Sequence, residues 1–506
     1  MLKPNGLDPL KRLQQNSLGL YSLLVIPSLL LWLYYGSTDA SLSRSIKGTW
    51  QGTLWHFPGL NALASRVLLD TLEALVIVAL GWLFYRGYRL LTQWKPNSPA
   101  SNQNEALPRT ILSWTALCGA VLIFTTPFHS SDIFGYLNRG FQQSVFQTNP
   151  YLTTISQIPQ WQNSPLLHAH WIDNPCPYGF FFARLTDWVT RWSGPSFTGA
   201  YLLFKGLNWL LLLASTWLIA KISRLMGHPN PWLAAYCWGA NPLVLLHAMG
   251  NGHNDIIMVF LLLMALWALL SQRFQWTCLP LLTLSILTKY ASLLAAPFIL
   301  LALWQKKARG SLLLGLGLSA LLLLWLGAGY VDPAQPWPWN ALLDNAGKPQ
   351  HSVISLLANA LYYPLKWCHA PAKALQTQFL SVFKPLFWVG FASFYGWRLW
   401  TTLKTSPLAD QRLLREIALV SVVMIAFISA KFHPWYPVMF LPLCLLLPQS
   451  SRLRQFALIF SLFQLAGFTI LQNLPVISEI LLTLVPLWLT LKGSALFKQT
   501  EQTSGI

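Results

Sequence analysis

The residues best suited to chemistry follow an apolar segment that ends near residue 127. The sequence there reads Thr-Thr-Pro-Phe-His-Ser-Ser-Asp-Ile-Phe-Gly-Tyr, and its acid is Asp132. Ser130 or Ser131 is suited to cap a following helix, which would place Asp132 in the first helical turn. A carboxylate there can act as a general base toward a hydroxyl group, or it can serve only as a helix cap. The residue types leave both roles open.

A second polar turn, at residues 247–255, interrupts two apolar runs. It reads His-Ala-Met-Gly-Asn-Gly-His-Asn-Asp, and its two glycines permit sharp backbone geometry. His253, Asn254 and Asp255 can hydrogen-bond a polar ligand or join neighbouring loops. The alternative is a capped hairpin turn with Asp255 at the start of the next helix.

Basic and aromatic residues mark two further junctions. Lys289 stands alone between two apolar runs, and a lysine at the membrane boundary is costly without an anionic partner. That partner is either a lipid phosphate or a nearby carboxylate. Lys431 and His433 add cationic capacity beside Trp435 and Tyr436, two residues that are also typical of the aromatic belt of membrane proteins.

The sequence indicates no metal and no cofactor. His168, His170 and Asp173 could bind a metal, but a pair of surface histidines is the more frequent meaning of this spacing. No P-loop and no dinucleotide-binding glycine pattern stands in a suitable context, and the chain has no Asp-x-Asp pair. Cys176 and Cys368 lie in segments expected on the same face, where a disulfide between them could form.

Composition excludes a soluble enzyme, a coiled coil and a disordered chain. Of 506 residues, 54% are hydrophobic and only 10% are charged, against about 25% charged residues in soluble proteins. Mean hydropathy is +0.46. We therefore expect an all-α, polytopic membrane protein with about fourteen spans of about 20 residues each, in one domain over residues 1–506. The apolar runs lie at 18–36, 67–86, 110–127, 198–220, 231–248, 255–271, 275–288, 290–305, 311–330, 379–398, 416–431, 435–449, 455–472 and 479–492.

The distribution of basic residues predicts the orientation. Net charge is +19, from 34 Lys and Arg against 15 Asp and Glu. The basic residues are dispersed at the ends of apolar runs, which indicates a topology signal and contact with anionic lipid, and not a nucleic acid partner. With both termini in the cytoplasm, most of them fall in short inner loops. The long polar segments 128–197 and 331–378 then become the first and second extracytoplasmic loops.

Together these segments resemble the C superfamily of glycosyltransferases, multi-span enzymes that use polyprenyl-phosphate sugars. Within it the chain is most similar to bacterial polyprenyl-phosphomannose-dependent α-1,6-mannosyltransferases. The matching pieces, in chain order, are Ser131-Asp132-Ile133-Phe134-Gly135-Tyr136 with Gly140, then Asn149-Pro150-Tyr151, Pro177-Tyr178-Gly179, Gly252-His253-Asn254-Asp255, Thr288-Lys289-Tyr290 and His433-Pro434-Trp435-Tyr436.

The resemblance implies that Asp132, in the first outer loop, is the catalytic base of an inverting transfer. The expected donor is a polyprenyl-phosphate sugar, with mannose as the sugar, and the acceptor is an extracytoplasmic lipid-linked or cell-envelope glycan. Donor phosphate binding is expected from Lys289, Lys431, His433 and Arg139. Sugar and acceptor contacts are expected from Tyr136, Asn149, Tyr151, Tyr178, His253, Asn254, Asp255, Trp435 and Tyr436.

Three other functions remain as alternatives. A transporter or flippase of lipid-linked glycans would need ionisable residues near mid-span and two related halves, whereas here these residues gather at one face. A polymerase or ligase of lipid-linked glycans would share the expected topology. A non-catalytic scaffold of the cell envelope would not need Asp132, Lys289 and the turn 247–255 together.

The orientation is testable with reporter fusions. A reporter placed after Arg309 should be cytoplasmic, and one inserted within 155–165 should be extracytoplasmic, because basic residues crowd the opposite loops. Alkaline phosphatase and green fluorescent protein activities measure the two compartments. If both sites report the same compartment, the predicted layout is wrong.

Overall fold

The computed structural model describes residues 9–35, 62–94, 102–125, 127, 130–169, 171–331, 350–468 and 475–493. In these ranges the regular structure is helical, apart from one parallel bridge between Gln350 and Lys431. The all-α prediction is therefore confirmed for this part of the chain.

The α-helices in chain order are α1 (Pro9–Tyr35), α3 (Ala62–Thr92), α4 (Asn102–Ile123), α5 (Asp132–Ser144), α6 (Phe180–Ser193), α7 (Phe197–Leu225), α8 (Pro231–Gly239), α9 (Asp255–Ser271), α10 (Cys278–Ile286), α11 (Ala296–Gln305), α12 (Arg309–Gly327), α14 (Val353–Trp367), α15 (Ala372–Leu403), α16 (Asp410–Val422), α17 (Pro437–Leu445), α18 (Arg452–Gln464), α19 (Pro475–Glu479) and α20 (Val485–Leu491). Three π-helical segments, η3 (Val244–Gly250), η6 (Val423–Ile428) and η9 (Ile480–Leu484), interrupt this series. Short 3-10 segments include η5 (Tyr290–Ala295).

Each predicted apolar run overlaps helical residues, but the number of membrane spans is not established. Among the described residues, five helices are long and apolar enough to cross a membrane, and a sixth results if the bent pair Val244–Gly250 and Asp255–Ser271 is one span. Several runs are divided into shorter helices. Run 231–248, for example, passes from α8 into η3, and run 416–431 passes from α16 into η6. The structure thus supports a membrane protein without confirming about fourteen spans.

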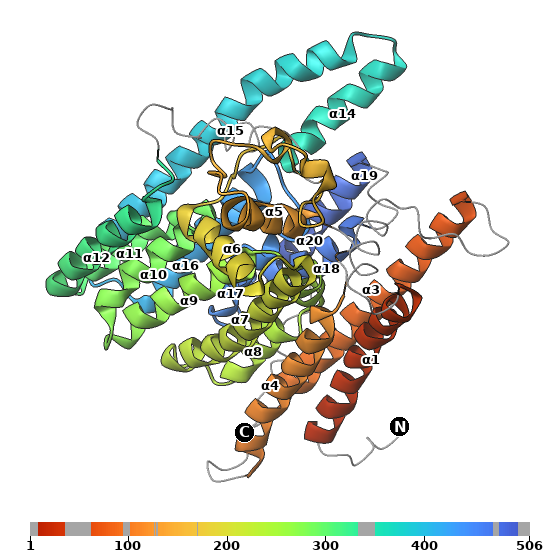
Figure 1. The fold of residues 1–506 in the computed structure, drawn as a ribbon. Coiled ribbons are helices and arrows are strands. Elements are labelled where there is room, and N and C mark those ends of the chain that lie inside the picture. Colours follow the sequence, from red (N-terminus) through yellow and green to blue (C-terminus); the bar gives the residue numbers. More distant parts are fainter. Residues whose placement is uncertain are drawn as a thin grey trace, which may run out of the picture.

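The helices form a central body with two appendages (Figure 1). α1, α3 and α4 pack together at one side, and α4 joins them to α7. α14 and α15 form a hairpin that projects from the body (Figure 1). Helix α14 occupies part of the segment 331–378 that we expected as an outer loop, and residues 332–349 of that segment lie outside the described residues.

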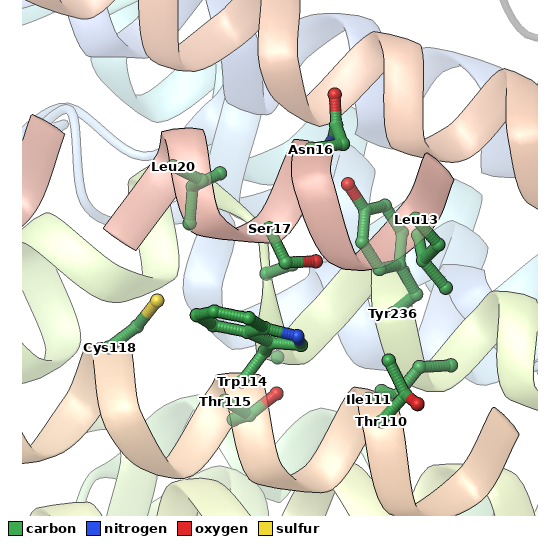
Figure 2. A pocket seen from close by; sticks show the side chains of 12 residues that line it. Leu13, Asn16, Ser17, Leu20, Thr110, Ile111, Trp114, Thr115, Cys118 and Tyr236 are labelled. Carbon is green, nitrogen blue, oxygen red and sulfur yellow. The ribbon is translucent and has the colours of Figure 1, made fainter. Parts of the chain in front are cut away.

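The contact between α1 and α4 is close and leaves almost no empty space. A cavity of only about 10 Å³ remains there, beside side chains of α1, α4 and α8. Figure 2 shows the indole of Trp114, from α4, between Ser17 of α1 and the α4 backbone. A cavity this small leaves no room for a substrate, so we assign this region to packing.

α5 and α6 lie together within the segment 128–197 and bring Asp132 to the body. Residues Ile133 to Gln143 of α5 are all buried, because α5 packs against α6 and α7. Ser130 Oγ accepts a hydrogen bond from the Asp132 backbone N–H at 3.3 Å, whereas Ser131 makes no side-chain cap. The predicted helix start at Asp132 is confirmed. Of the two candidate serines, Ser130 is the one whose hydroxyl accepts a hydrogen bond from the Asp132 backbone N–H.

Gly140 allows the close approach of α5 and α6. A Cβ at this position would lie 2.5 Å from the backbone oxygen of Thr186 and 2.6 Å from Cγ2 of Thr190. Because a backbone atom cannot rotate away, any side chain here would separate the two helices.

Gly140→Ala should therefore destabilise the protein, by about 1–3 kcal/mol for an overpacked contact. Gly206→Ala is the matched control, because Gly206 lies inside α7 and a Cβ added there would meet no neighbouring atom within 4 Å, and alanine is the better helix former. Thermal unfolding of the purified proteins in detergent measures both. Equal melting temperatures would show that α5 and α6 can separate without cost.

Candidate active site

Asp132 and His253 face each other although they come from distant segments. His253 Nδ1 lies 3.5 Å from Oδ2 of Asp132, and the Asp132 side chain is 19% exposed. Burial acts to raise the pKa of Asp132, but His253 and Lys289 outweigh that effect and hold the pKa below its ordinary value of 3.8. Asp132 is therefore an ionised proton acceptor at neutral pH.

The turn between η3 and α9 delivers His253 to this position. Gly252 adopts φ +70°, and a Cβ there would lie 2.6 Å from Cδ1 of Ile133 in α5. Glycine is required because it tolerates this φ and leaves space for Ile133. Asn254 Oδ1 accepts a hydrogen bond from the Tyr136 hydroxyl at 3.2 Å. The expected sharp turn is thus confirmed at Gly252, and it packs directly against α5.

Lys289 has a carboxylate partner in the protein. Its Nζ lies 2.7 Å from Oδ1 of Asp255, which is the first residue of α9 and is fully buried. The ammonium also lies 5.0 Å from the centre of the Tyr436 ring. The sequence left a lipid phosphate and a carboxylate open as partners of Lys289, and in the structure Lys289 pairs with the carboxylate of Asp255. Asp255 also begins helix α9, as expected.

Aromatic rings stack on His253, the histidine that faces Asp132. The Trp435 ring lies 4.2 Å from His253 and 4.3 Å from His433, between centroids, with interplanar angles of 20° and 4°. Burial, together with Lys431, lowers the pKa of His433 to about 3, although Asp132 opposes the shift. His433 is therefore neutral at pH 7. His433 thus offers this site a hydrogen bond and not the expected positive charge.

These groups open onto a cavity of about 970 Å³. Among its lining residues are nine of the predicted site residues, namely Asp132, Tyr136, Arg139, Tyr178, Lys289, Lys431, His433, Trp435 and Tyr436. His253, Asn254 and Asp255 lie behind this wall, in contact with Asp132, Tyr136 and Lys289 respectively. A cavity of this size accommodates a sugar together with part of a lipid chain.

Arg139 lines the cavity, and two of its hydrogen-bond donors are buried without a partner among the described residues. Its Nη2 donates to the backbone oxygens of Trp171 and Asn174, and Arg139 is only 4% exposed. In the described part of the chain, Nε and Nη1 have no hydrogen-bond partner. Nearby, the Lys431 ammonium lies 5.5 Å from the centre of the Trp171 ring. An anionic group is the ligand that best fits such donors.

Asn149 and Tyr151 are not part of the cavity wall. Asn149 Nδ2 donates to the Tyr330 backbone oxygen at 3.1 Å, and the Tyr151 hydroxyl donates to the Tyr178 backbone oxygen at 2.8 Å. Both residues hold the loop that follows α5 against the segment after α12. Tyr151 thus supports Tyr178 of the cavity wall, Asn149 holds the segment after α12, and neither residue lines the cavity.

Sequence reasoning missed one wall of the cavity. That wall comes from η5, α11, α15 and η6, and its residues include Leu293, Pro297, Trp388, Phe391 and Met424. These side chains are ordinary apolar residues within predicted spans, so no local signal separates them from lipid-facing neighbours. Trp171 and Asn174 also line the cavity, and their position in a Pro- and Asn-rich loop was the only signal.

The candidate metal site is not tested by the structure, and the disulfide is not formed in it. Among the described residues, no group of three or more His, Cys, Asp or Glu could hold a metal ion, and His170 lies outside those residues. Cys176 and Cys368 are free thiols, the first buried and the second exposed. The disulfide hypothesis is wrong in this structure, because the fold places one cysteine in the core and the other at the surface.

The Lys289–Asp255 pair generates a stability prediction. Lys289→Met should destabilise the protein by about 3–5 kcal/mol, because it leaves the buried Asp255 without a counter-charge. The double variant Lys289→Met with Asp255→Asn should recover most of that loss. Thermal unfolding in detergent measures both effects.

A second lysine–aspartate pair supplies the control. Lys306 and Asp410 are 2.8 Å apart, but the Asp410 side chain is 35% exposed. Lys306→Met should therefore cost about 1 kcal/mol or less. Equal losses for the two lysine variants would show that burial of Asp255 does not matter.

Known proteins similar to this chain include several bacterial mannosyltransferases. Alpha-(1->6)-mannopyranosyltransferase A of Corynebacterium glutamicum is 28% identical over 179 residues, which cover 35% of this chain and 36% of that protein. The protein of the same name from Mycobacterium tuberculosis is 26% identical over 265 residues, or 50% of this chain and 46% of that protein. The matched regions thus span less than half of these relatives. No solved structure matches the chain.

The family comparison covers more than half of the chain and includes most of the site. Residues 31–305 match the family described as alpha-(1->6)-mannopyranosyltransferase, N-terminal domain. This range contains Asp132, the turn with His253 and Asp255, and Lys289, whereas Lys431 to Tyr436 lie beyond it. The resemblance expected from the motifs is confirmed, and the chain belongs to the alpha-(1->6)-mannopyranosyltransferase family.

Proposed function

We propose that the protein transfers mannose from a polyprenyl-phosphate donor to an extracytoplasmic glycan acceptor, with inversion at the anomeric carbon and with Asp132 as general base. One observation carries this proposal. An ionised carboxylate stands at a 970 Å³ cavity whose wall is polar and cationic near Asp132 and apolar elsewhere. A lipid-linked sugar has the same division into a polar and an apolar part.

The chemistry is a single displacement. The acceptor hydroxyl oxygen forms a bond to the anomeric carbon while the bond from that carbon to the phosphate oxygen breaks. As the new bond forms, the hydroxyl becomes strongly acidic, so even a carboxylate with a lowered pKa can accept its proton. His253, 3.5 Å from Oδ2, keeps Asp132 ionised and oriented. The departing polyprenyl phosphate is already stable as an anion and needs no proton donor.

The cations of the cavity would stabilise the charge on the leaving phosphate. Arg139 lines the cavity, and Lys431 lies nearby over Trp171. Lys289 retains two further N–H groups beside its bond to Asp255. Neutral His433 adds a hydrogen bond, and an adjacent phosphate would favour its protonation. Donors held in place before the reaction stabilise developing charge without reorganisation.

The apolar part of the cavity fits a prenyl chain. Leu293, Leu294 and Leu300 line it on one side, and Trp388 and Phe391 of α15 line it on the other. Leu293 is 55% exposed and Trp388 is 46% exposed. The apolar wall therefore continues onto the outer surface of the helices, where lipid would contact it. A chain that stays partly in the bilayer could enter here without complete transfer into the protein.

In the proposed orientation, both termini are in the cytoplasm and Asp132 is on the outer side, and exposed tryptophan and basic residue pairs then mark the inner membrane–water interface. Four such pairs lie on helices that we expect to end at the cytoplasmic side, with the cation 4.5–5.5 Å from the ring centre. They are Trp82 with Arg86, Trp217 with Lys221, Trp400 with Lys404, and Trp488 with Lys492. Such pairs favour the membrane–water interface, where the ring contacts lipid and the charged group contacts water and headgroups.

A polymerase or ligase of lipid-linked glycans is the nearest alternative, because it would need a similar base and cavity. A transporter is less well supported, since Asp132, Arg139, Lys289 and Lys431 gather at one cavity, whereas a transporter would need ionisable residues near mid-span. The transfer assay separates these functions. Purified protein is incubated with labelled polyprenyl-phosphomannose and membrane glycolipids, and the labelled product is analysed for one added mannose.

Asp132→Asn should lower transfer about 10²–10⁴-fold while donor binding is retained. The amide keeps the size of the side chain but cannot take the proton. If Asp132 were only a helix cap, the same variant would lose about 1 kcal/mol of stability or less and little activity. Initial rates and donor binding, measured on the same purified sample, distinguish the two roles.

Asp187→Asn is the matched control for Asp132→Asn. Asp187 is also a buried acid of the segment 128–197, but it pairs with Arg191 on α6 and does not line the cavity. It should retain near-normal transfer. If Asp132→Asn is active and Asp255→Asn is inactive, the base has been assigned to the wrong segment. If both are active, the enzyme proposal loses its chemical centre.

A further inference from the structure

A fully buried lysine lies beneath the site and takes no part in the mechanism above. Lys205 belongs to α7 and is 0% exposed. It lies about 12 Å along the helix axis from Phe197, the first residue of α7. Its Nζ donates to the backbone oxygen of Thr125 at 3.0 Å, to the Thr125 hydroxyl at 3.2 Å and to the backbone oxygen of Gly250 at 2.7 Å. All three acceptors are neutral oxygens.

The two backbone oxygens belong to the C-terminal ends of two different helices. Thr125 follows α4, which ends at Ile123, and Gly250 is the last residue of η3. Helix C-termini carry unpaired carbonyl groups and a partial negative charge. Two such ends would repel each other and would cost free energy if buried without donors. Lys205 supplies donors to both ends at one point.

Each helix end leads directly into a segment of the site. After Thr125 the chain continues to Asp132 at the start of α5, and after Gly250 it continues through Gly252 to His253 and Asp255. The relative position of the two helix ends therefore contributes to how the Asp132 and His253 segments meet. A single side chain joins the two segments where both leave their helices.

Two neighbours of Lys205 on α7 make the same kind of contact. The Tyr201 hydroxyl donates to the Thr125 backbone oxygen. Asn208 Nδ2 donates to the backbone oxygens of Ala248 at 3.3 Å and His253 at 3.2 Å. Tyr201, Lys205 and Asn208 share one face of α7, since they are spaced by four and three residues. In contrast, Thr216 further along α7 donates to Leu212 within its own helix.

We propose that Lys205 is a positioning residue, which joins the C-terminal ends of α4 and η3 and thereby holds His253 against Asp132, with Asn208 as a second anchor of the same turn. The expected loss of kcat rests on the proposed function. The expected loosening of the turn 250–255 does not depend on it. Lys205 touches neither substrate nor reacting atoms in this proposal.

The test compares Lys205→Met and Asn208→Leu with the control Thr216→Val, which removes a buried hydroxyl that contacts neither segment. Hydrogen–deuterium exchange with mass spectrometry measures protection of peptide 250–256. Both test variants should exchange there at least about tenfold faster than wild type, while peptides from the remainder of α7 stay unchanged. Thr216→Val should match wild type throughout.

Transfer kinetics give the second measurement. A misplaced catalytic pair should lower kcat by about 10–100-fold, with KM for the donor changed about twofold or less, because the cavity wall is intact. If Lys205→Met fails to fold, Asn208→Leu decides, since it removes donors to the same turn and keeps the size of the side chain.

Three results would overturn the proposal: unchanged exchange in peptide 250–256 in the folded test variants, faster exchange along all of α7, or full kcat despite a loosened turn. The second would assign Lys205 to general stability. If wild type transfers no mannose, the proposed function fails, but the exchange measurement still shows whether Lys205 holds the turn.

Discussion

The close contact between α5 and the turn 250–255 is the constraint on which the site depends. Ile133 occupies the space that a side chain at residue 252 would need, so the two backbones can approach only with Gly252 at φ +70°. This approach brings His253 to 3.5 Å from Asp132. It also allows the hydrogen bond between Tyr136 and Asn254. If either segment shifted, the base would lose its orienting partner.

The low number of acids makes the electrostatics of the site simple. The cavity wall contains Asp132 as its acid, and Asp255 lies just behind it, paired with Lys289. Asp132 itself faces His253, and Lys289 also helps to hold its pKa low. Arg139 and Lys431 add positive charge elsewhere on the cavity wall. The arrangement keeps Asp132 ionised and places positive charge at the wall where the proposed phosphate leaving group would lie. Burial of His433 in its neutral form limits the positive charge next to the base.

The shape of the cavity connects this chemistry with the membrane. Its polar end is built from α5, the loop before α6 and the segment 429–436, whereas its apolar wall comes from η5, α11, α15 and η6. The bridge between Gln350 and Lys431 and the hydrogen bond from Ser352 to Ala430 tie the start of α14 to the segment that carries His433. The α14–α15 hairpin thus contributes to both parts of the cavity. The residues before α14 hold the polar segment 429–436, and α15 supplies part of the apolar wall.

The sequence by itself determined the helical character, the membrane character and the resemblance to mannosyltransferases, because these follow from composition, from the length of apolar runs and from short motifs. Local spacing also sufficed to place Asp132 and Asp255 at helix starts, since capping depends on neighbours in the chain. Only the tertiary structure decided that Lys289 pairs with Asp255 and that His433 is neutral. It also decided that Asn149 and Tyr151 do not line the cavity. These properties depend on burial and on contacts between segments far apart in the chain, to which hydrophobic periodicity is insensitive. Lys205 lies within the predicted apolar run 198–220 and is unusual there, but its burial and its partners at the ends of α4 and η3 are set by the tertiary structure.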